Sequence, residues 1–534
     1  MPQSLTQCYA LISTALKSLV TGKPSKVLAF KSDHQQQQQQ QQQLDQIYHP
    51  GSLAVVCASL PKDVREAGIR RILDKIVESD SEDVIRVVAE TLISCDRLDD
   101  VLRLPPQPLE PFLCEFGALN KHLSAQPTTR DEARYIFLLS KLYGNYGQEG
   151  VASDVCVTLA ERKVADCLYP SLEERMELFV AALNYGTTKD TSTGAFKRDS
   201  RRIEEIEGKA KVLQFQMRLE NALRIRVKRL KAVSEDGAFD EALVLELEKS
   251  ADDLRENVKT LSDLYNDVAR PRCFWDICLE IVAWARPQQD VQQQSSEDAL
   301  AVPRELWDNV ILDAVEDVLC KANETHTRRA IVAAACAAVV EIAPKIFTES
   351  AANNAVAFPI CQITCRIETL ANGQWGALFN SPRVDESEQP EDDDVADCLL
   401  ASVRGNCQGV QRAYDRLLAP ESRRMHDEEI VKEMHHALQS TNLKLRMLRS
   451  VLRVMHAWDA ATGHGDLPGE DFGRNSDVDL SSSRKSYVRA SIGDICLAYA
   501  RVAKEFIADD AHQNLAKDLV AAFEQLGDRF LRDI

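Results

Sequence analysis

Three aspartates in the C-terminal third of the chain have a spacing that can hold a metal ion. Asp393 and Asp394 are adjacent, and Asp397 follows three residues later in the sequence DDVAD. Residues three or four apart share one face of a helix, so this spacing brings carboxylates together. Clustered carboxylate oxygens are the ligands that Mg²⁺ prefers, and the ion can then bind phosphate groups of a substrate. The pattern is therefore a candidate for chemistry.

Two interpretations of this aspartate pattern compete. The first is an all-α, magnesium-dependent prenyl-transfer enzyme, because such enzymes hold magnesium and diphosphate through an aspartate-rich motif of this kind. The second is an acidic, solvent-exposed loop that runs into a helix. Residues 380–396 are rich in acidic residues, with Pro and Ser among them, and no second aspartate motif follows. Such a composition is typical of a segment that does not fold on its own, so the sequence favours the second interpretation.

A second group of metal-binding residue types lies between His426 and the pair His435 and His436. Glu429 and Glu433 share a helix face, and His436 lies seven residues after Glu429. A zinc site needs three or four ligands around one point, and no third ligand is well placed in this group. We interpret it as the polar face of a helix.

The rest of the chain lacks the motifs of common nucleotide-dependent and hydrolytic enzymes. Asp471–Gly473 reads DFG, as in protein kinases, but no glycine-rich loop, lysine strand or catalytic loop accompanies it. Neither a GxxxxGK[ST] phosphate loop nor a GxSxG nucleophile turn is present. We therefore predict a protein that is not an enzyme, with no catalytic residues, no cofactor and no bound metal.

Composition indicates a folded, acidic protein. The chain has 534 residues, of which 45% are hydrophobic and 28% are charged, and its net charge is −19. Such an acidic chain is a poor general binder of nucleic acid or of anionic membranes. Its 15 cysteines include no CxxC pair and mostly lie among apolar residues, which indicates a reducing compartment, nuclear or cytosolic. No apolar run is long enough to cross a bilayer.

One segment departs from this acidity. Residues 197–231 contain 12 Lys and Arg against 5 Asp and Glu, and their pattern predicts one long helix. Cations crowd its C-terminal end, where the helix dipole favours them. The segment is either a patch for nucleic acid or an acidic partner, or a long helix whose basic end is solvated, and the second interpretation is favoured. Charge reversal of Arg224, Arg226, Lys228 and Arg229 distinguishes the two.

These residues belong to a chain whose apolar positions recur with a helical period almost everywhere. Gly and Pro are scarce and strand-like alternation is hard to find, so we expect an all-α fold. Helix pairs joined by short turns over hundreds of residues stack most simply into an extended α-helical solenoid of antiparallel pairs. The expected helices include 171–185, 199–233, 250–268 and 392–417.

Domain organisation follows from where the helical period stops. We expect an N-terminal helix at 1–20, a polyglutamine insertion without fixed structure at 21–46, and one α-solenoid over 47–534. Polar segments interrupt the solenoid as exposed loops, because they lack the apolar surface that offsets the entropy of ordering. These loops are expected at 187–198, 287–302, 380–396 and 463–483.

Helix 171–185 has the clearest end signals. Ser171 and Glu174 form a capping-box pattern, and Gly186 suits the C-terminal end. No residue of this helix is a candidate catalyst. Its apolar residues predict one buried face, which consists of Leu172, Met176, Phe179, Val180 and Leu183. The N-terminal helix carries a similar stripe that includes Leu16 and Leu19, so we expect it to pack into a core.

Six helical segments, taken together, point to a family. They are DRLDDVLRLPPQPLEPFL (96–113), RYIFLLSKLYGNYGQEGVASDVCVTLAERK (134–163), SLEERMELFVAAL (171–183), IEEIEGKAKVLQFQMRLENAL (203–223), LSDLYNDVARPRCFWDICLEIVAWA (261–285) and ELWDNVILDAV (305–315). In this order and at these spacings, they resemble the C-terminal helical region of the scaffold nucleoporins of the 155/157/170 type. The resemblance is strongest over 96–320.

The resemblance implies a non-enzymatic scaffold of the inner ring of the nuclear pore complex, located at the nuclear envelope of the nucleus. Its implied partners are other inner-ring scaffold nucleoporins and short linear motifs of linker nucleoporins, within a large hetero-oligomer. Its implied role is to support the transport of protein and RNA between nucleus and cytoplasm. The resemblance maps no partner-binding residues. A different helical-repeat trafficking or coat scaffold is the alternative of the same kind.

Two departures from the family limit this expectation. The family carries an N-terminal β-propeller with a membrane-contacting loop, whereas this chain has no strand-rich region. We therefore expect no β-propeller and no direct membrane contact within this chain. Only two Phe-Gly pairs occur, at Phe116–Gly117 and Phe472–Gly473, so the chain is not expected to be a repeat protein of the transport barrier.

Overall fold

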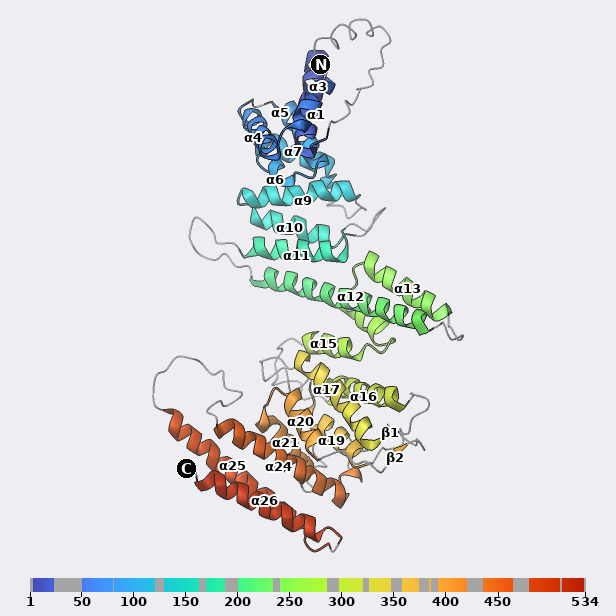
Figure 1. The fold of residues 1–534 in the computed structure, drawn as a ribbon, viewed down its shortest axis with the longest axis vertical. Coiled ribbons are helices and arrows are strands. Elements are labelled where there is room, and N and C mark those ends of the chain that lie inside the picture. Colours follow the sequence, from blue (N-terminus) through green and yellow to red (C-terminus); the bar gives the residue numbers. More distant parts are fainter. Residues whose placement is uncertain are drawn as a thin grey trace. The chain divides into compact units, whose positions relative to one another are not determined.

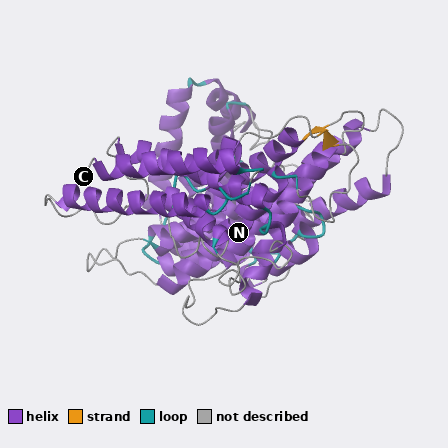
Figure 2. Ribbon diagram, turned by 90° about the horizontal axis from the view of Figure 1, so that it is seen from below, coloured by secondary structure: helices purple, strands orange, loops and turns teal. Residues whose placement is uncertain are grey.

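The fold is almost entirely helical (Figures 1 and 2). The computed structural model describes residues 3–23, 50–79, 81–120, 129–162, 170–187, 200–233, 241–285, 297–319, 326–346, 358–373, 384–385, 392–419, 436–463, 480–509 and 511–532. These residues form two compact units, Met1–Leu264 and Tyr265–Ile534.

The helices of the first unit are α1 (Gln3–Thr21), α3 (Pro50–Ser59), α4 (Lys62–Ser79), α5 (Glu82–Ser94), α6 (Leu98–Val101), α7 (Pro106–Phe116), α9 (Arg130–Asn145), α10 (Glu149–Ala160), α11 (Leu172–Gly186), α12 (Ser200–Val233), α13 (Glu241–Glu256) and α14 (Leu261–Asp263). Helix α1 packs on α3, α4 and α5, and from α7 onward each helix packs mainly on its neighbours in sequence. From α9 onward, α10, α11, α12 and α13 follow one another in a stack.

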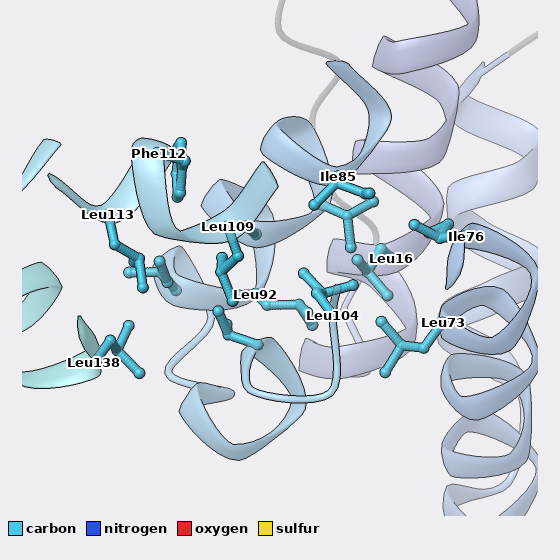
Figure 3. Close-up of a cluster of buried hydrophobic side chains, with 14 of the residues drawn as sticks. Leu16, Leu73, Ile76, Ile85, Leu92, Leu104, Leu109, Phe112, Leu113 and Leu138 are labelled. Carbon is cyan, nitrogen blue, oxygen red and sulfur yellow. The ribbon is translucent and has the colours of Figure 1, made fainter. Parts of the chain in front are cut away.

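Apolar side chains from α1 to α9 fill the first core of this unit (Figure 3). Leu16 and Leu19 of α1 are buried in it, which confirms the prediction that this helix packs into a core. The N-terminal helix expected at 1–20 is thus part of the first unit. The other members shown in Figure 3 include Leu73, Ile85, Leu92, Leu109 and Leu138.

A second core joins α9, α10, α11 and the first half of α12, and α11 lies at its centre. The capping box predicted at Ser171 and Glu174 is present at the start of α11. The Glu174 carboxylate accepts from the Ser171 N–H at 2.8 Å, and the Ser171 hydroxyl accepts from the Glu174 N–H at 3.2 Å. Thr129 and Glu132 make the same reciprocal pair before α9. These caps satisfy backbone donors that a helix start leaves without intrahelical partners.

The buried face of α11 differs from the predicted one. It consists of Leu172, Arg175, Leu178, Phe179 and Ala182, while Val180 is 49% exposed. An arginine lies inside this face because its guanidinium donates hydrogen bonds to backbone carbonyls that have no partner within a helix. Arg175 donates through Nη1 to the carbonyl of Ala160, the last residue of α10, and through Nε to the carbonyl of Pro170 at 3.1 Å. Burial lowers the pKa of this side chain to about 10.

The second unit is also built of helices. Its elements are η2 (Leu264–Ala269, a π-helical turn), α15 (Trp275–Ala285), α16 (Glu297–Leu319), β1 (His326–Thr327), α17 (Arg328–Ile346), α19 (Ile360–Ala371), β2 (Val384–Asp385), α20 (Asp392–Ser402), α21 (Cys407–Leu418), α24 (Thr441–Gly463), α25 (Leu480–Lys504) and α26 (Gln513–Arg532). Several helices of this unit, such as α17 and α20, pack on helices that are not their neighbours in sequence. Its core includes a T-shaped ring pair, Trp307 and Phe358, whose centroids lie 5.2 Å apart. Tyr414 donates to the fully buried Glu368 at 2.7 Å.

The last two helices form an antiparallel hairpin that depends on two glycines. A Cβ atom on Gly527 of α26 would lie 3.3 Å from the Gly493 carbonyl of α25, and the reverse distance is also 3.3 Å. Such a contact is tighter than most side chains make, so the two helix backbones approach closely here and a larger side chain would have to displace one of them. Lys504 and Glu524 form an ion pair at 2.6 Å between the same helices.

Two predicted helices are placed differently in the structure. The helix expected at 250–268 begins earlier, as α13, and is followed by a new start at Thr260, which caps α14. The helix expected at 392–417 is broken into α20 and α21, because Arg404 and Gly405 adopt positive φ angles of 53° and 80°. Such a left-handed residue commonly ends a helix, and glycine adopts it without strain. Apolar periodicity continues across the break, which hid it from the sequence analysis.

Three of the segments expected as loops contain helix starts. Helix α16 begins at Glu297, α20 at Asp392 and α25 at Leu480, inside the expected loops 287–302, 380–396 and 463–483. The first turn of a helix favours acidic and hydroxyl residues and is often solvated, so it resembles a loop in sequence. The expected loop 187–198 lies outside the described residues apart from its first residue, and so does most of the insertion 21–46.

The all-α prediction is confirmed, with one small addition. Within the part of the chain that the structure describes, the only strands are β1 and β2, which pair in parallel over two residues each. His326 pairs with Val384, and Thr327 with Asp385. The single array expected over 47–534 is divided between the two units, with the boundary at the π-helical turn η2.

Candidate interaction surfaces

Two of the three aspartates in the DDVAD sequence face arginines from two other helices. Asp397 of α20 accepts from Nε and Nη2 of Arg453 on α24, at 3.0 and 3.2 Å. Asp394 lies 3.9 Å from Nε of Arg329 on α17, and the side chain of Asp393 lies outside the described residues. Guanidinium groups therefore meet two of these three carboxylates and tie α20 to its neighbours.

No metal site is formed by the described residues. They contain no group of three or more His, Cys, Asp or Glu side chains that could hold a metal ion. Of the histidine and glutamate group, only His436 is described, and its side chain is exposed. His426, Glu429, Glu433 and His435 lie outside the described residues, as does Asp471–Gly473.

The basic segment forms the long helix α12, which pairs with α13. Arg224 bonds to Glu220 on its own helix and to Asp252 of α13 at 3.2 Å. Lys231 of α12 lies 2.6 Å from Glu248 of α13. The hydrogen bond that Arg224 donates to Glu220 is the main cause of a raised pKa for Arg224. On the side that faces α13, the positive charge of α12 is thus met by carboxylates.

An aromatic patch on the first unit was missed by the sequence analysis. It consists of Arg86 on α5, Phe112 and Phe116 on α7, and Tyr135 on α9. The Phe116 ring lies 4.7 Å from that of Phe112 and 5.6 Å from that of Tyr135, between centroids. The Arg86 guanidinium carbon lies 5.9 and 6.0 Å from the two phenylalanine centroids. Glu115 forms an ion pair with this arginine and holds it over the rings.

The chemistry of this patch suits protein recognition. Phe116 is 40% exposed. Its ring is therefore accessible to a partner, and it packs on the buried ring of Phe112. Burial raises the pKa of the Tyr135 phenol, as do the nearby carboxylates of Glu90 and Asp131. The phenol therefore stays protonated and can donate a hydrogen bond. Aromatic residues and arginine are the types that most often dominate binding energy at protein interfaces.

Comparison with known families identifies the protein's class. The model of the non-repetitive/WGA-negative nucleoporin C-terminal family matches residues 3–444. The chain belongs to this nucleoporin family. The match extends well beyond both ends of the 96–320 region in which the resemblance was strongest, and the resemblance is thereby confirmed.

Solved structures show the same fold. The nucleoporin chain is similar to Nup170 CTD of Chaetomium thermophilum in its complex with Nup145N, with 14% identity, a TM-score of 0.52, and coverage of 94% of this chain and 83% of that one. It is also similar to Nup170 SOL of the same organism, with 14% identity, a TM-score of 0.52, and coverage of 98% of this chain and 59% of that one. At this identity the likeness concerns the fold.

Among the described helices of this nucleoporin, none is both long enough and apolar enough to cross a membrane.

Proposed function

We propose that this chain is a scaffold nucleoporin of the inner ring of the nuclear pore complex, where it binds other nucleoporins and supports transport of protein and RNA. The family match over residues 3–444 carries the proposal. The likeness to the Nup170 CTD–Nup145N complex supports it, because a related fold is there seen with another nucleoporin. The chain acts by binding, through side chains on the outer faces of stacked helices.

We propose further that the aromatic patch is one contact for a partner's short linear motif. An apolar side chain of the motif packs on Phe116, while Tyr135 and Arg86 donate hydrogen bonds to its backbone carbonyls. Such motifs bind through a few anchor side chains, so a single aromatic residue can dominate the affinity. This assignment concerns one surface and can fail without affecting the scaffold function.

Both proposals are tested by calorimetry of the full chain with a counterpart of Nup145N taken from this chain's own organism. We expect binding to the unaltered chain and about 30-fold weaker binding after Phe116→Ser, the loss typical of an interface anchor. Tyr146→Ser is the matched control, because Tyr146 is an aromatic residue that is 52% exposed outside the patch. Its affinity should be unchanged. If the unaltered chain, Phe116→Ser and Tyr146→Ser bind equally well, the proposal for the aromatic patch is rejected and the scaffold proposal stands.

Location in cells tests the scaffold proposal independently. A proximity-labelling tag on the full chain should label nuclear-rim proteins, chiefly other nucleoporins. A label that follows coated vesicles, or spreads through the cytosol, would instead favour a trafficking or coat scaffold and would reject the pore.

The magnesium-dependent enzyme is tested with the metal alone. With Asp397 bound to Arg453 and Asp394 near Arg329, we expect Mg²⁺ to leave the midpoint of thermal unfolding unchanged. A rise in the midpoint that disappears in Asp394→Asn would revive the enzyme hypothesis.

A further inference from the structure

The outer side of α12 near its C-terminal end is chemically distinct from its other sides. Leu223 and Val227 are buried. Ile225 lies between them in sequence and therefore points the opposite way, because each helical residue turns by about 100°. Its side chain is 41% exposed. An apolar side chain is thus presented to solvent on the helix face farthest from the core.

Two cations flank this isoleucine. Lys228 and Arg229 follow it by three and four residues, so they lie beside it on the same helix face. Both are exposed, and neither has an ion-pair partner in the described part of the chain. They differ from Arg224 and Lys231, whose charges are met by carboxylates of α13. We call Ile225, Lys228 and Arg229 the basic outer face of α12.

We propose that the basic outer face of α12 binds an acidic segment of a protein partner that carries an apolar side chain. Carboxylates of the segment pair with Lys228 and Arg229, and its apolar side chain packs on Ile225. The mixture of charge and apolar surface matches a peptide, which offers both in alternate positions. This proposal does not depend on the aromatic patch, which involves other helices.

The surroundings favour an acidic peptide over a nucleic acid. Helix α13 lies alongside and carries Glu246, Glu248, Asp252 and Asp253, and the whole chain has a net charge of −19. A phosphate backbone carries charge at every nucleotide and extends past any short patch, so it would meet this negative surface. A short peptide places a few carboxylates at chosen points. It can therefore contact the two cations without approaching α13.

The dimensions suit a short segment. The basic outer face of α12, from Ile225 to Arg229, spans about 6 Å along the helix axis at about 1.5 Å per residue. An extended peptide covers that length with about two residues at about 3.3 Å each. A partner segment with two carboxylates and one leucine within a few residues of one another therefore satisfies the proposed contacts.

Fluorescence anisotropy with the full chain tests the proposal, using a labelled eight-residue probe rich in Asp and Glu with one central Leu. We expect measurable binding that weakens as salt increases, because exposed charge pairs are screened. The double variant Lys228→Glu/Arg229→Glu should weaken binding by about tenfold or more, because two attractions become repulsions. Ile225→Ser should weaken it by a smaller factor, and replacing the probe's Leu by Ser should have a matching effect.

The control is a double reversal at exposed cations of α25 and α26, Arg501→Glu/Lys517→Glu, which changes net charge equally. It should leave binding unchanged. Equal losses in the control and in Lys228→Glu/Arg229→Glu would show non-specific attraction and overturn the proposal, as would absence of binding to the unaltered chain. Tighter binding of a single-stranded oligonucleotide of equal charge than of the peptide would overturn it in favour of nucleic acid.

Discussion

Two adjacent residues of α11 allow a sharp test of which face of this helix is buried. Phe179 and Val180 were both expected on the apolar face, yet the structure leaves Phe179 1% exposed and Val180 49% exposed. We therefore predict opposite responses to alanine. Phe179→Ala should strongly destabilise the stack of α9 to α12, whereas Val180→Ala should be neutral or slightly stabilising.

The magnitudes follow from burial. Removing a fully buried phenylalanine ring loses about 2–3 kcal/mol of transfer free energy, and the cavity left among α9 to α12 adds to this. The expected total is about 3–5 kcal/mol. Val180→Ala removes exposed atoms, which changes stability by no more than about 0.5 kcal/mol. Alanine also has the higher helix propensity, which offsets the small loss of apolar contact.

Hydrogen exchange of the full chain is the appropriate assay, because a stack of helices can open locally. A loss of 3–5 kcal/mol lowers amide protection in α10 and α11 by a factor between about 150 and about 5,000. Helices of the second unit serve as an internal reference that should not change. Comparable losses in the two variants, or a Phe179→Ala effect below about 1 kcal/mol, would show that the assignment of the buried face is wrong.

Three further predictions concern other contacts. Gly527→Leu should force α25 and α26 apart at Gly493 and lower the melting temperature, since overpacking costs about 1–3 kcal/mol. Gln216→Leu should accelerate amide exchange at the end of α13 by leaving buried backbone groups without partners. The Arg97 hydrogen bond lowers the pKa of Glu66, so this carboxylate stabilises the fold above its unfolded pKa of about 4.3. The stability difference between the unaltered chain and Glu66→Gln, measured by urea unfolding, should therefore shrink as the pH falls below that value.

Much of the fold could be predicted because local signals agree with the tertiary packing. The capping boxes at Thr129 and Ser171 mark helix starts that the structure reproduces. Ile206 and Leu213 of α12 lie seven residues apart, on one face of the helix, and both are buried. Propensity, capping and apolar pattern point to the same conclusion in these segments. The all-α fold class could therefore be predicted from local sequence signals, without knowledge of any long-range contact.

The misplaced features depend on contacts between segments distant in sequence. Phe116 follows Phe112 by one helical turn, and that spacing alone predicts only a buried pair. Its ring also lies against that of Tyr135 on α9, a contact that the local sequence does not reveal. The ion pair of Asp397 depends on Arg453, which lies on a helix 56 residues away. No local pattern distinguishes an aspartate that awaits a metal ion from one that meets an arginine.

Arg175 and Gln216 show why buried polar residues belong in a stack held mainly by apolar contacts. Apolar stripes attract one another without fixing how far one helix slides along the next, because the hydrophobic effect has no direction. Gln216 of α12 donates to the carbonyls of Leu254 and Asn257, and it accepts from the Lys259 N–H at 2.9 Å. It therefore meets backbone groups that the end of α13 leaves without intrahelical partners. Arg175 does the same for the end of α10.

A slip of one turn moves a helix by about 5.4 Å. It would break every one of these hydrogen bonds, while many apolar contacts survive. We infer that the apolar stripes supply most of the adhesion, and that these two side chains fix the register in which the helices stack.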